Sequence, residues 1–84
     1  MSQVRRNGVQ SVERALEILE VIASRGGATT LSELAHATGL PAATAHRLLR
    51  TMTEAGFVVQ LKNRSYGLGD KLGPIGEVAT LRTR

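Results

Sequence analysis

Apolar residues recur at intervals of three and four near the start of the chain, and this spacing predicts a helix from about Ser11 to Ser24. Ser11 precedes the pattern and is expected to cap the helix with its hydroxyl group, and Gly26-Gly27 is expected to end it. The apolar stripe consists of Val12, Ala15, Leu16, Ile18, Leu19, Ile22 and Ala23. It is wide for so short a helix, which indicates a second contact such as one with another subunit.

Two further helices with a tight turn between them are predicted from Thr30 to Gly56. Thr30 and Glu33 have the spacing of a capping box, so a helix is expected to begin at Thr30 and to end at Gly39. Pro41 is expected at the first position of the third helix, where a residue without an N–H group loses no hydrogen bond, and Gly56 is expected to end that helix. The side chains expected to face inward are Leu31, Leu34 and Ala35 from the second helix, and Ala45, Leu48, Leu49, Met52 and Ala55 from the third.

After Gly56 the period of the pattern changes from about 3.6 residues to about 2, which predicts a strand with one buried face. The alternating residues are Phe57, Val59 and Leu61 on one side and Val58, Gln60 and Lys62 on the other. A polar turn is expected over 62–65, followed by a short return strand at Tyr66 and Leu68. The two runs and the turn therefore predict a β-hairpin.

Helix, helix, turn, helix and hairpin is the order of a winged helix-turn-helix fold, which is mainly α with a small β-hairpin. We expect this domain over residues 9–69; for the central helix pair alone, an αα-hairpin in another helical domain is the alternative. Residues 1–8 lack a periodic apolar pattern and are expected to form a mobile arm. Residues 70–84 are expected to begin a linker helix, with helical spacing over Pro74–Leu81 that Gly73 and Pro74 interrupt.

Charge favours a polyanionic partner. The chain has 84 residues and a formal net charge of +4, and five basic residues against two acids lie within 41–71. A basic surface suits nucleic acid. The alternative is that a charge of this size does no more than keep a small protein soluble. The sequence has no run of about 20 apolar residues and no apolar signal-peptide core, so a cytoplasmic protein without membrane contact is expected.

Several kinds of chemistry are not expected. The chain has no Cys, which excludes disulfides, Cys-based zinc sites and a thiol nucleophile. His36 and His46 fall on different predicted helices, and neither has a second ligand one turn away. No nucleophile with a base and no pair of carboxylates can be placed together. We therefore expect no metal site, no cofactor and no enzymatic activity.

The outward face of the third predicted helix carries the candidate site. In a winged helix-turn-helix domain this helix lies in the major groove and its outward side chains read bases. The side chains opposite the buried face are Ala43, His46, Arg47, Arg50 and Glu54, with Thr44 on the flank. Ala43, Thr44 and Arg47 are the expected base contacts because the N-terminal part enters deepest, and Arg50 is expected to reach a phosphate. The alternative for Arg47 and Arg50 is a solvated helix face that pairs with Glu54.

Three other positions are candidates for phosphate contacts. Lys62 and Arg64 flank the predicted hairpin tip, where they can meet the DNA backbone, although a solubilising turn would look the same. Thr30 begins the second helix, whose N-terminal N–H groups and partial positive charge suit a phosphate.

The sequence resembles the IclR family of bacterial transcription regulators over about residues 9–72. The segments that carry the resemblance are VQSVERALEILEVIA from Val9, LSELAHATGLPAATAHRLLRTMTEAGFV from Leu31 and SYGLG from Ser65. The resemblance implies a winged helix-turn-helix domain joined by a linker helix to an effector-binding domain that lies outside this sequence. It also implies homodimers that pair through the first helix and the linker helix on pseudo-palindromic operators, most often as repressors. Any small-molecule effector would then act only through the missing C-terminal domain.

On the same resemblance, Thr44 and Arg47 take the place of recognition-helix contacts, and Arg14 takes the place of a phosphate-binding arginine. The predicted wing tip, residues 62–65, departs from the Asp-Gly type of turn that is common in the family. The alternative function is a winged-helix module that binds another protein and no DNA, which predicts a more apolar face on the third helix. An RNA-binding protein is a third possibility, and it is disfavoured by the lack of exposed aromatic residues that could stack on bases.

Overall fold

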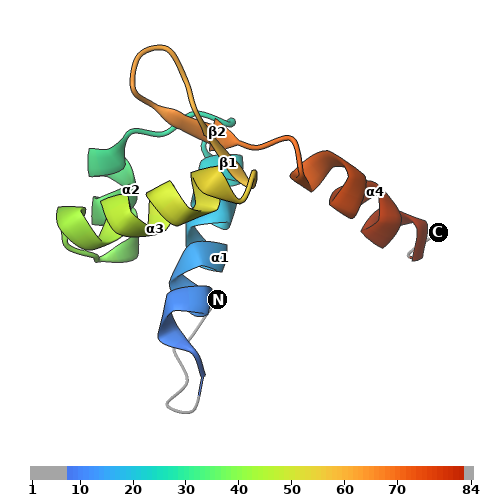
Figure 1. Cartoon of the computed structure of the whole chain (residues 1–84), viewed down its shortest axis with the longest axis horizontal. Coiled ribbons are helices and arrows are strands. Elements are labelled where there is room, and N and C mark those ends of the chain that lie inside the picture. The colour runs from blue at the N-terminus through green and yellow to red at the C-terminus, as the bar shows by residue number, and fades with distance from the viewer. Residues whose placement is uncertain (1–7, 83–84) are drawn as a thin grey trace.

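The predicted order of elements and the winged helix-turn-helix fold are confirmed. The computed structural model describes residues 8–82, and Figure 1 shows how its elements are arranged. They are α1 (Gln10–Ser24), α2 (Leu31–Thr38), α3 (Ala42–Glu54), β1 (Val58–Gln60), β2 (Tyr66–Leu68) and α4 (Leu72–Arg82). The predicted arm over residues 1–8 lies outside the described residues, apart from Gly8.

The core lies where the first three helices meet the hairpin. Its buried members are Ile18 and Ile22 from α1, Leu34 from α2, Leu49 and Met52 from α3, Val58 from β1 and Tyr66 from β2. Leu31 and Leu48, both expected to face inward, are half-buried against this cluster. Ala55 was expected in the buried face but is exposed, because it is the cap residue at which α3 ends. The core therefore fixes the inward face of α3 and leaves its opposite face to the solvent.

Two helix starts differ from the prediction by a residue or two. Ser11 does not cap α1; Val9 is the cap residue, with no side-chain hydrogen bond, and its carbonyl accepts from the N–H groups of Val12 and Glu13 at 3.1 Å. Pro41 is the cap residue of α3 and not its first helical residue, since its ψ of 146° is extended while its carbonyl accepts from Ala45 N–H at 3.0 Å. The cap of α1 therefore lies two residues before the predicted one, and α3 begins one residue after its predicted start.

The capping box at the start of α2 is confirmed. The Thr30 hydroxyl accepts from the Glu33 N–H at 3.1 Å, and the Thr30 N–H donates to the Glu33 carboxylate at 3.0 Å. The bond from the Thr30 backbone holds the pKa of Glu33 below its ordinary value, and the guanidinium of Arg25 acts in the same direction. The carboxylate therefore stabilises the fold at neutral pH, and this contribution is lost as the pH falls through the lowered pKa.

The turn between α2 and α3 depends on Gly39, which has a left-handed φ of 71°. We expect Gly39→Val to lower the free energy of unfolding by about 1–2 kcal/mol or more, because a β-branched residue is strained in this conformation. A Cβ at Gly39 would meet no atom within 4 Å, so the loss would come from the backbone and not from a clash. Thermal melting followed by circular dichroism would measure it. The matched control is Gly76→Val on α4, which is equally uncrowded but helical, and equal melting temperatures for the two variants would contradict the prediction.

The buried face of the first hairpin strand is the opposite of the one that the alternating pattern suggested. Val58 is 2% exposed and Val59 is 42% exposed, whereas Phe57, Val59 and Leu61 were grouped as one face of the strand. The reason is that β1 begins at Val58, and Phe57 still belongs to the turn after α3, where its N–H donates to the Met52 carbonyl at 3.0 Å. β1 and β2 pair antiparallel with Val58 opposite Leu68, and β2 also pairs with Thr29 through an isolated bridge. The wing thus rests on the segment between α1 and α2.

Helix α4 begins at Leu72, two residues before the predicted start. Pro74 is accommodated because it lies in the first turn, where an N–H group would have no helical acceptor. No residue of α4 is buried, and in Figure 1 it extends away from the other elements. The segment that leads into α4 is held in place at Gly69. The Gly69 N–H donates to the Phe57 carbonyl at 2.9 Å, and any Cβ at this position would overlap the Gly56 carbonyl. The end of α3 and the start of α4 are therefore joined by a close backbone contact.

Candidate nucleic-acid interface

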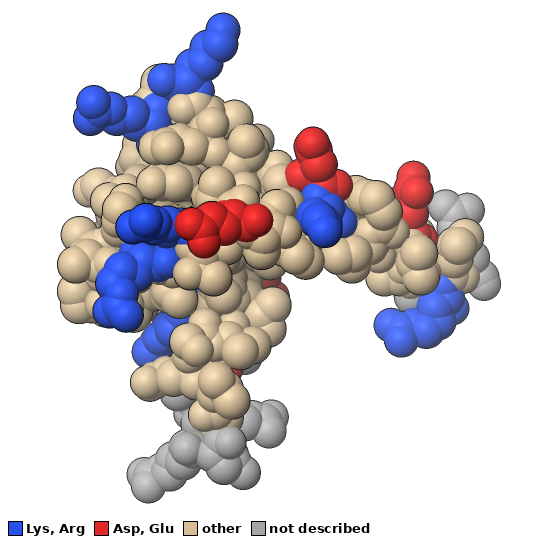
Figure 2. All heavy atoms as spheres, in the orientation of Figure 1, with Lys and Arg blue, Asp and Glu red and all other residues tan. Residues whose placement is uncertain are grey.

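The outer face of α3 carries the predicted polar side chains. Ala45, Leu49 and Met52 point into the core, and the residues on the other side are exposed, as the helical spacing predicted. These exposed residues are Ala43, His46, Arg47, Arg50 and Glu54, and Thr44 is half-buried on the flank. Figure 2 shows Lys and Arg side chains gathered over α3 and at the tip of the hairpin loop on the same face of the molecule. The surface is polar and basic, unlike the apolar centre of a protein-binding face.

The two arginines of α3 differ in their surroundings. The Arg50 Nε lies 3.9 Å from the Glu54 carboxylate, in an ion pair whose side chains are 74% and 72% exposed. Such an exposed pair contributes little to stability and does not prevent the arginine from binding a ligand. Arg47 forms no ion pair within residues 8–82. Its guanidinium group, with all its donors available, lies nearer the N-terminus of α3, the end expected to enter a groove.

The wing tip is a three-residue loop of exposed polar residues, Lys62, Asn63 and Arg64. It is closed by the Leu61 N–H, which donates to the Ser65 carbonyl at 2.7 Å, and by the Arg64 N–H, which donates to the Leu61 carbonyl at 3.1 Å. The Asn63 side-chain oxygen accepts from both the N–H and the hydroxyl of Ser65, which is itself buried. These bonds give the loop a defined shape, with one basic side chain on each side of Asn63.

The last residue of that loop has a backbone conformation that the sequence did not indicate. Arg64 has a φ of 69°, and it is the only residue other than glycine with a positive φ in the described part of the chain. Three-residue hairpin loops commonly place glycine at this left-handed position. Residues 62–65 contain no glycine, so in this loop a residue with a Cβ adopts the left-handed conformation.

The remaining candidate residues are present but partly engaged. At the start of α2 the capping box already uses the N–H groups of Thr30 and Glu33, and it places a carboxylate beside them. On α1, Arg14 bonds to the Glu17 carboxylate at 3.2 Å, with side chains 24% and 31% exposed. Arg25, which the sequence analysis did not single out, is exposed and close enough to Glu33 to affect its pKa. The only feature of the sequence that pointed to Arg25 was its position immediately before the two glycines that end α1.

Two further findings concern other kinds of site. Among residues 8–82 there is no group of three or more His, Cys, Asp or Glu side chains that could hold a metal ion. Nor does that part of the chain contain a helix with the length and apolar character needed to cross a bilayer.

Three packed helices, a tight turn before an exposed basic helix, and a hairpin beside it define a winged helix-turn-helix domain. Residues 11–62 match the model of the IclR helix-turn-helix domain. Because the match covers more than half of the chain, the protein belongs to the IclR helix-turn-helix domain family.

Curated relatives are named as transcriptional regulators, which as a class are not enzymes. The chain is 53% identical over 53 residues to the transcriptional repressor IclR of Escherichia coli, covering 63% of this chain and 19% of that protein. It is 38% identical over 81 residues to the glycerol operon regulatory protein of Streptomyces coelicolor, covering 90% of this chain and 32% of the relative. The chain thus spans about a fifth to a third of the length of these relatives.

Solved structures give the same family. An IclR transcriptional regulator from Alicyclobacillus acidocaldarius superposes with a TM-score of 0.80 at 34% sequence identity, over 86% of this chain and 30% of that one. The fold prediction and the predicted resemblance are both confirmed by these comparisons.

Proposed function

We propose that this chain binds double-stranded DNA sequence-specifically, as the DNA-binding domain of a bacterial transcriptional regulator that acts most simply as a repressor. The observation that carries the proposal is the outer face of α3, which is exposed, basic and backed by a rigid apolar core. In domains of this fold the corresponding helix lies in the major groove and its N-terminal residues contact base edges. A regulator of this kind acts in the cytoplasm, where the nucleoid is.

The side chains of α3 divide into those that contact bases and those that contact phosphates. Arg47 has unpaired donors that can form two bonds to the edge of a guanine, and Thr44 has both a hydroxyl and a methyl group for a base edge. Ala43 and His46 complete the surface that enters the groove. Arg50 lies about one turn further along α3, beside Glu54, and its guanidinium suits a phosphate at the rim of the groove.

Phosphate contacts outside α3 would orient the domain. Lys62 is a flexible single charge at the start of the wing loop, and it can neutralise a phosphate without reading sequence. Thr30 presents the N-terminus of α2, where the partial positive charge also favours a phosphate. Arg14 would have to share its guanidinium between Glu17 and a phosphate, since it bonds to Glu17 at 3.2 Å in the free protein.

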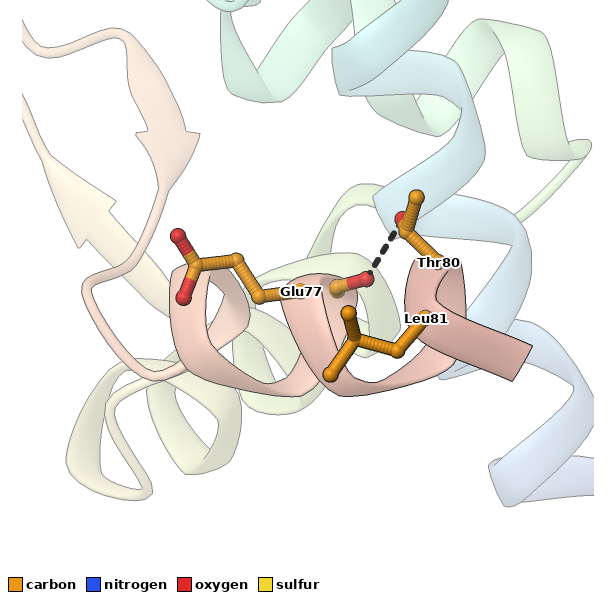
Figure 3. Close-up of a pocket in the computed structure, with 4 residues that line it drawn as sticks. Glu77, Thr80 and Leu81 are labelled. Atoms are coloured by element: carbon orange, nitrogen blue, oxygen red, sulfur yellow. Dashed lines mark hydrogen bonds between the residues drawn. The ribbon is translucent and has the colours of Figure 1, made fainter. Parts of the chain in front are cut away.

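We also propose that two copies pair through α1 and α4. Both helices expose apolar side chains: Val12 and Leu16 on α1 are 54% and 56% exposed, and Val78 and Leu81 on α4 are both 69% exposed. A helix as short as α4 is marginal in water when nothing packs on it, so burial against a second copy would supply the missing stabilisation. Figure 3 shows the side of α4 that carries Leu81, where Gly76, Glu77, Thr80 and Leu81 line a hollow. The Thr80 hydroxyl bonds to the Gly76 carbonyl at 2.8 Å within the helix.

A paired form would place two α3 helices on a pseudo-palindromic operator with half-sites about 34 Å apart, or a multiple of that distance. We expect the isolated chain to pair weakly and the operator to promote pairing, because DNA brings the two copies together. Sedimentation velocity of the chain with and without a palindromic duplex would show a two-to-one complex. A strictly one-to-one complex at saturating protein would contradict the proposed dimer while leaving DNA binding intact.

The experiment that tests the function is selection of bound sequences from a random pool of DNA duplexes. We expect an enriched palindromic motif, and an affinity for it that falls steeply as salt increases. Binding to every duplex with the same affinity would contradict sequence-specific recognition. No binding to DNA at low salt would favour the alternative, a winged-helix module for protein contacts. Any small-molecule effector is proposed to act through a part of the protein other than this domain.

A further inference from the structure

We infer that the hydroxyl group of Thr51 donates a hydrogen bond to a DNA phosphate, on the strand opposite to the one that Arg50 reaches. This inference rests on the proposed function, and it adds a contact at a residue that the sequence analysis did not single out. It also determines how α3 lies in the major groove, with one flank close against one strand. Two features of α3 support it: the available hydroxyl group of Thr51, and the unequal lengths of the side chains on its two flanks.

The Thr51 hydroxyl group differs from those of several other threonines in the helices. The hydroxyl groups of Thr38 and Thr53 donate to the carbonyl four residues earlier at 2.7 Å, and that of Thr80 does so at 2.8 Å. Within residues 8–82 the Thr51 hydroxyl has no such bond, and its side chain is exposed. A hydroxyl group that does not bond to its own helix has its donor available for a ligand.

The core fixes the direction in which Thr51 points. Ala45, Leu49 and Met52 are buried, so the opposite side of α3 faces outward. Consecutive residues of a helix are rotated by about 100° around its axis. The outward direction falls between Arg50 and Thr51, because each lies about half of that rotation away from it. These two side chains therefore point to opposite flanks of the same exposed face.

The two flanks of α3 differ in the length of their side chains. The flank of Thr51 also carries Thr44 and Ala55, and we call these three residues the short flank. The flank of Arg50 also carries His46, so its side chains are long and polar. Thr44 is half-buried and the other four residues are exposed. The short flank can therefore approach a DNA backbone closely, whereas the other flank has to keep a greater distance.

The dimensions of the major groove allow both flanks to meet a backbone at once. The groove is about 12 Å wide, and a helix with its side chains is about 10–12 Å across. Hydroxyl groups and arginines are both common donors to phosphate oxygens. The short side chain of Thr51 reaches a phosphate only where its flank touches the strand, and the guanidinium group of Arg50 spans the remaining distance to the other strand. We therefore expect α3 to lie off-centre in the groove, against the strand that the short flank contacts.

The test combines Thr51→Val with methylphosphonate substitutions in a duplex that this protein selects from a random pool. A methylphosphonate replaces one charged phosphate oxygen with a methyl group, so it removes the contacts of one phosphate at a time. Thr51→Val keeps the shape of the side chain and removes its hydroxyl group. We expect the variant to bind the unmodified selected duplex about five- to tenfold more weakly per copy, in line with the loss of one hydrogen bond. At one phosphate, the methylphosphonate should weaken the wild type more than it weakens Thr51→Val.

Arg50→Ala identifies the opposite strand in the same set of duplexes. We expect this variant to lose its response to methylphosphonate at a phosphate across the same half-site, on the strand that Thr51 does not contact. If Thr51→Val and Arg50→Ala lose their responses on the same strand, the two flanks do not face opposite backbones and the inference is wrong.

Two matched variants separate a lost contact from a changed fold. Thr51→Ser keeps the hydroxyl group, and it should bind and respond to methylphosphonate like the wild type. Thr53→Val removes a hydroxyl group that is already bonded to the Leu49 carbonyl at 2.7 Å, and it should bind DNA like the wild type. Thr51→Val should melt at the same temperature as the wild type, because its side chain is exposed.

The failure of the inference is distinguishable from the failure of the proposed function. If Thr51→Val binds the selected duplex as tightly as the wild type, Thr51 makes no contact with DNA. If methylphosphonates weaken Thr51→Val and the wild type equally at every phosphate, the hydroxyl group does not bind the backbone. Either result overturns the inference and leaves DNA binding intact. If the wild type does not prefer the selected duplex over random DNA, the proposed function itself is wrong.

Discussion

Leu49→Ala is expected to lower the free energy of unfolding by about 2–5 kcal/mol, the largest loss of stability that we predict for a single substitution. Leu49 is 0% exposed and belongs to the core cluster that attaches α3 to the rest of the domain. The substitution removes buried apolar atoms and leaves a cavity, because the surrounding side chains relax only partly. Small domains have a total stability of about 5–15 kcal/mol, so the expected loss is a large share of the free energy of unfolding.

Urea unfolding followed by circular dichroism would measure the loss. The matched control is Leu81→Ala, the same chemical change at a side chain that is 69% exposed on α4. We expect the control to unfold at the same urea concentration as the wild type when the protein is dilute enough to be monomeric. If both variants lose the same stability, α3 is not attached to the core in the way the structure shows. Leu49→Ala should also weaken DNA binding in proportion to its unfolded fraction.

Local hydrogen-bonding patterns were predicted well from the sequence. The capping box of Thr30 and Glu33 and the glycine conformation at Gly39 were both identified, because the residue types themselves determine the geometry. The two faces of α3 were assigned correctly for Ala45, Leu49 and Met52, since a helix of that length has only one orientation that buries its apolar stripe.

Features that depend on where an element begins were predicted less well. Strand β1 has three residues, so counting Phe57 as part of it reversed the assignment of its buried face. A one-residue shift has this effect because side chains alternate between the faces of a strand. Ser11 was assigned as a cap from its type alone, yet the bonds to the Val9 carbonyl start α1 earlier.

The exposed face of α3 was predicted from the sequence, but the contacts of its side chains were not. The sequence places Arg47 and Arg50 on one face of α3, but only the structure shows that Arg50 lies 3.9 Å from Glu54. The left-handed Arg64 could not be predicted either, because the turn residues 62–65 fit several hairpin geometries and the bonds that choose one come from the buried Ser65.

Arg47→Ala is expected to cost about 1–3 kcal/mol of binding free energy on the selected duplex and to relax the preference at one base position. The physical reason is that a guanidinium group with free donors can make two bonds to a guanine edge, and no water restores both bonds in its absence. On random DNA the same variant should lose much less, because there Arg47 contributes only its charge. Fluorescence-anisotropy titrations on both duplexes across a salt series would separate the two contributions.

Arg50→Ala is the matched control, because it removes the same side chain from the same exposed face of α3, about one turn further along. Its ion pair with Glu54 is exposed and contributes little to folding, so the control should remain folded. We expect Arg50→Ala to weaken binding to both duplexes similarly. It should also reduce the slope of log affinity against log salt concentration by about one unit, as loss of one phosphate contact does. Lys62→Ala on the wing should behave in the same way. If Arg47→Ala loses as much on random DNA as on the selected duplex, Arg47 binds the backbone and another residue of α3 reads the sequence.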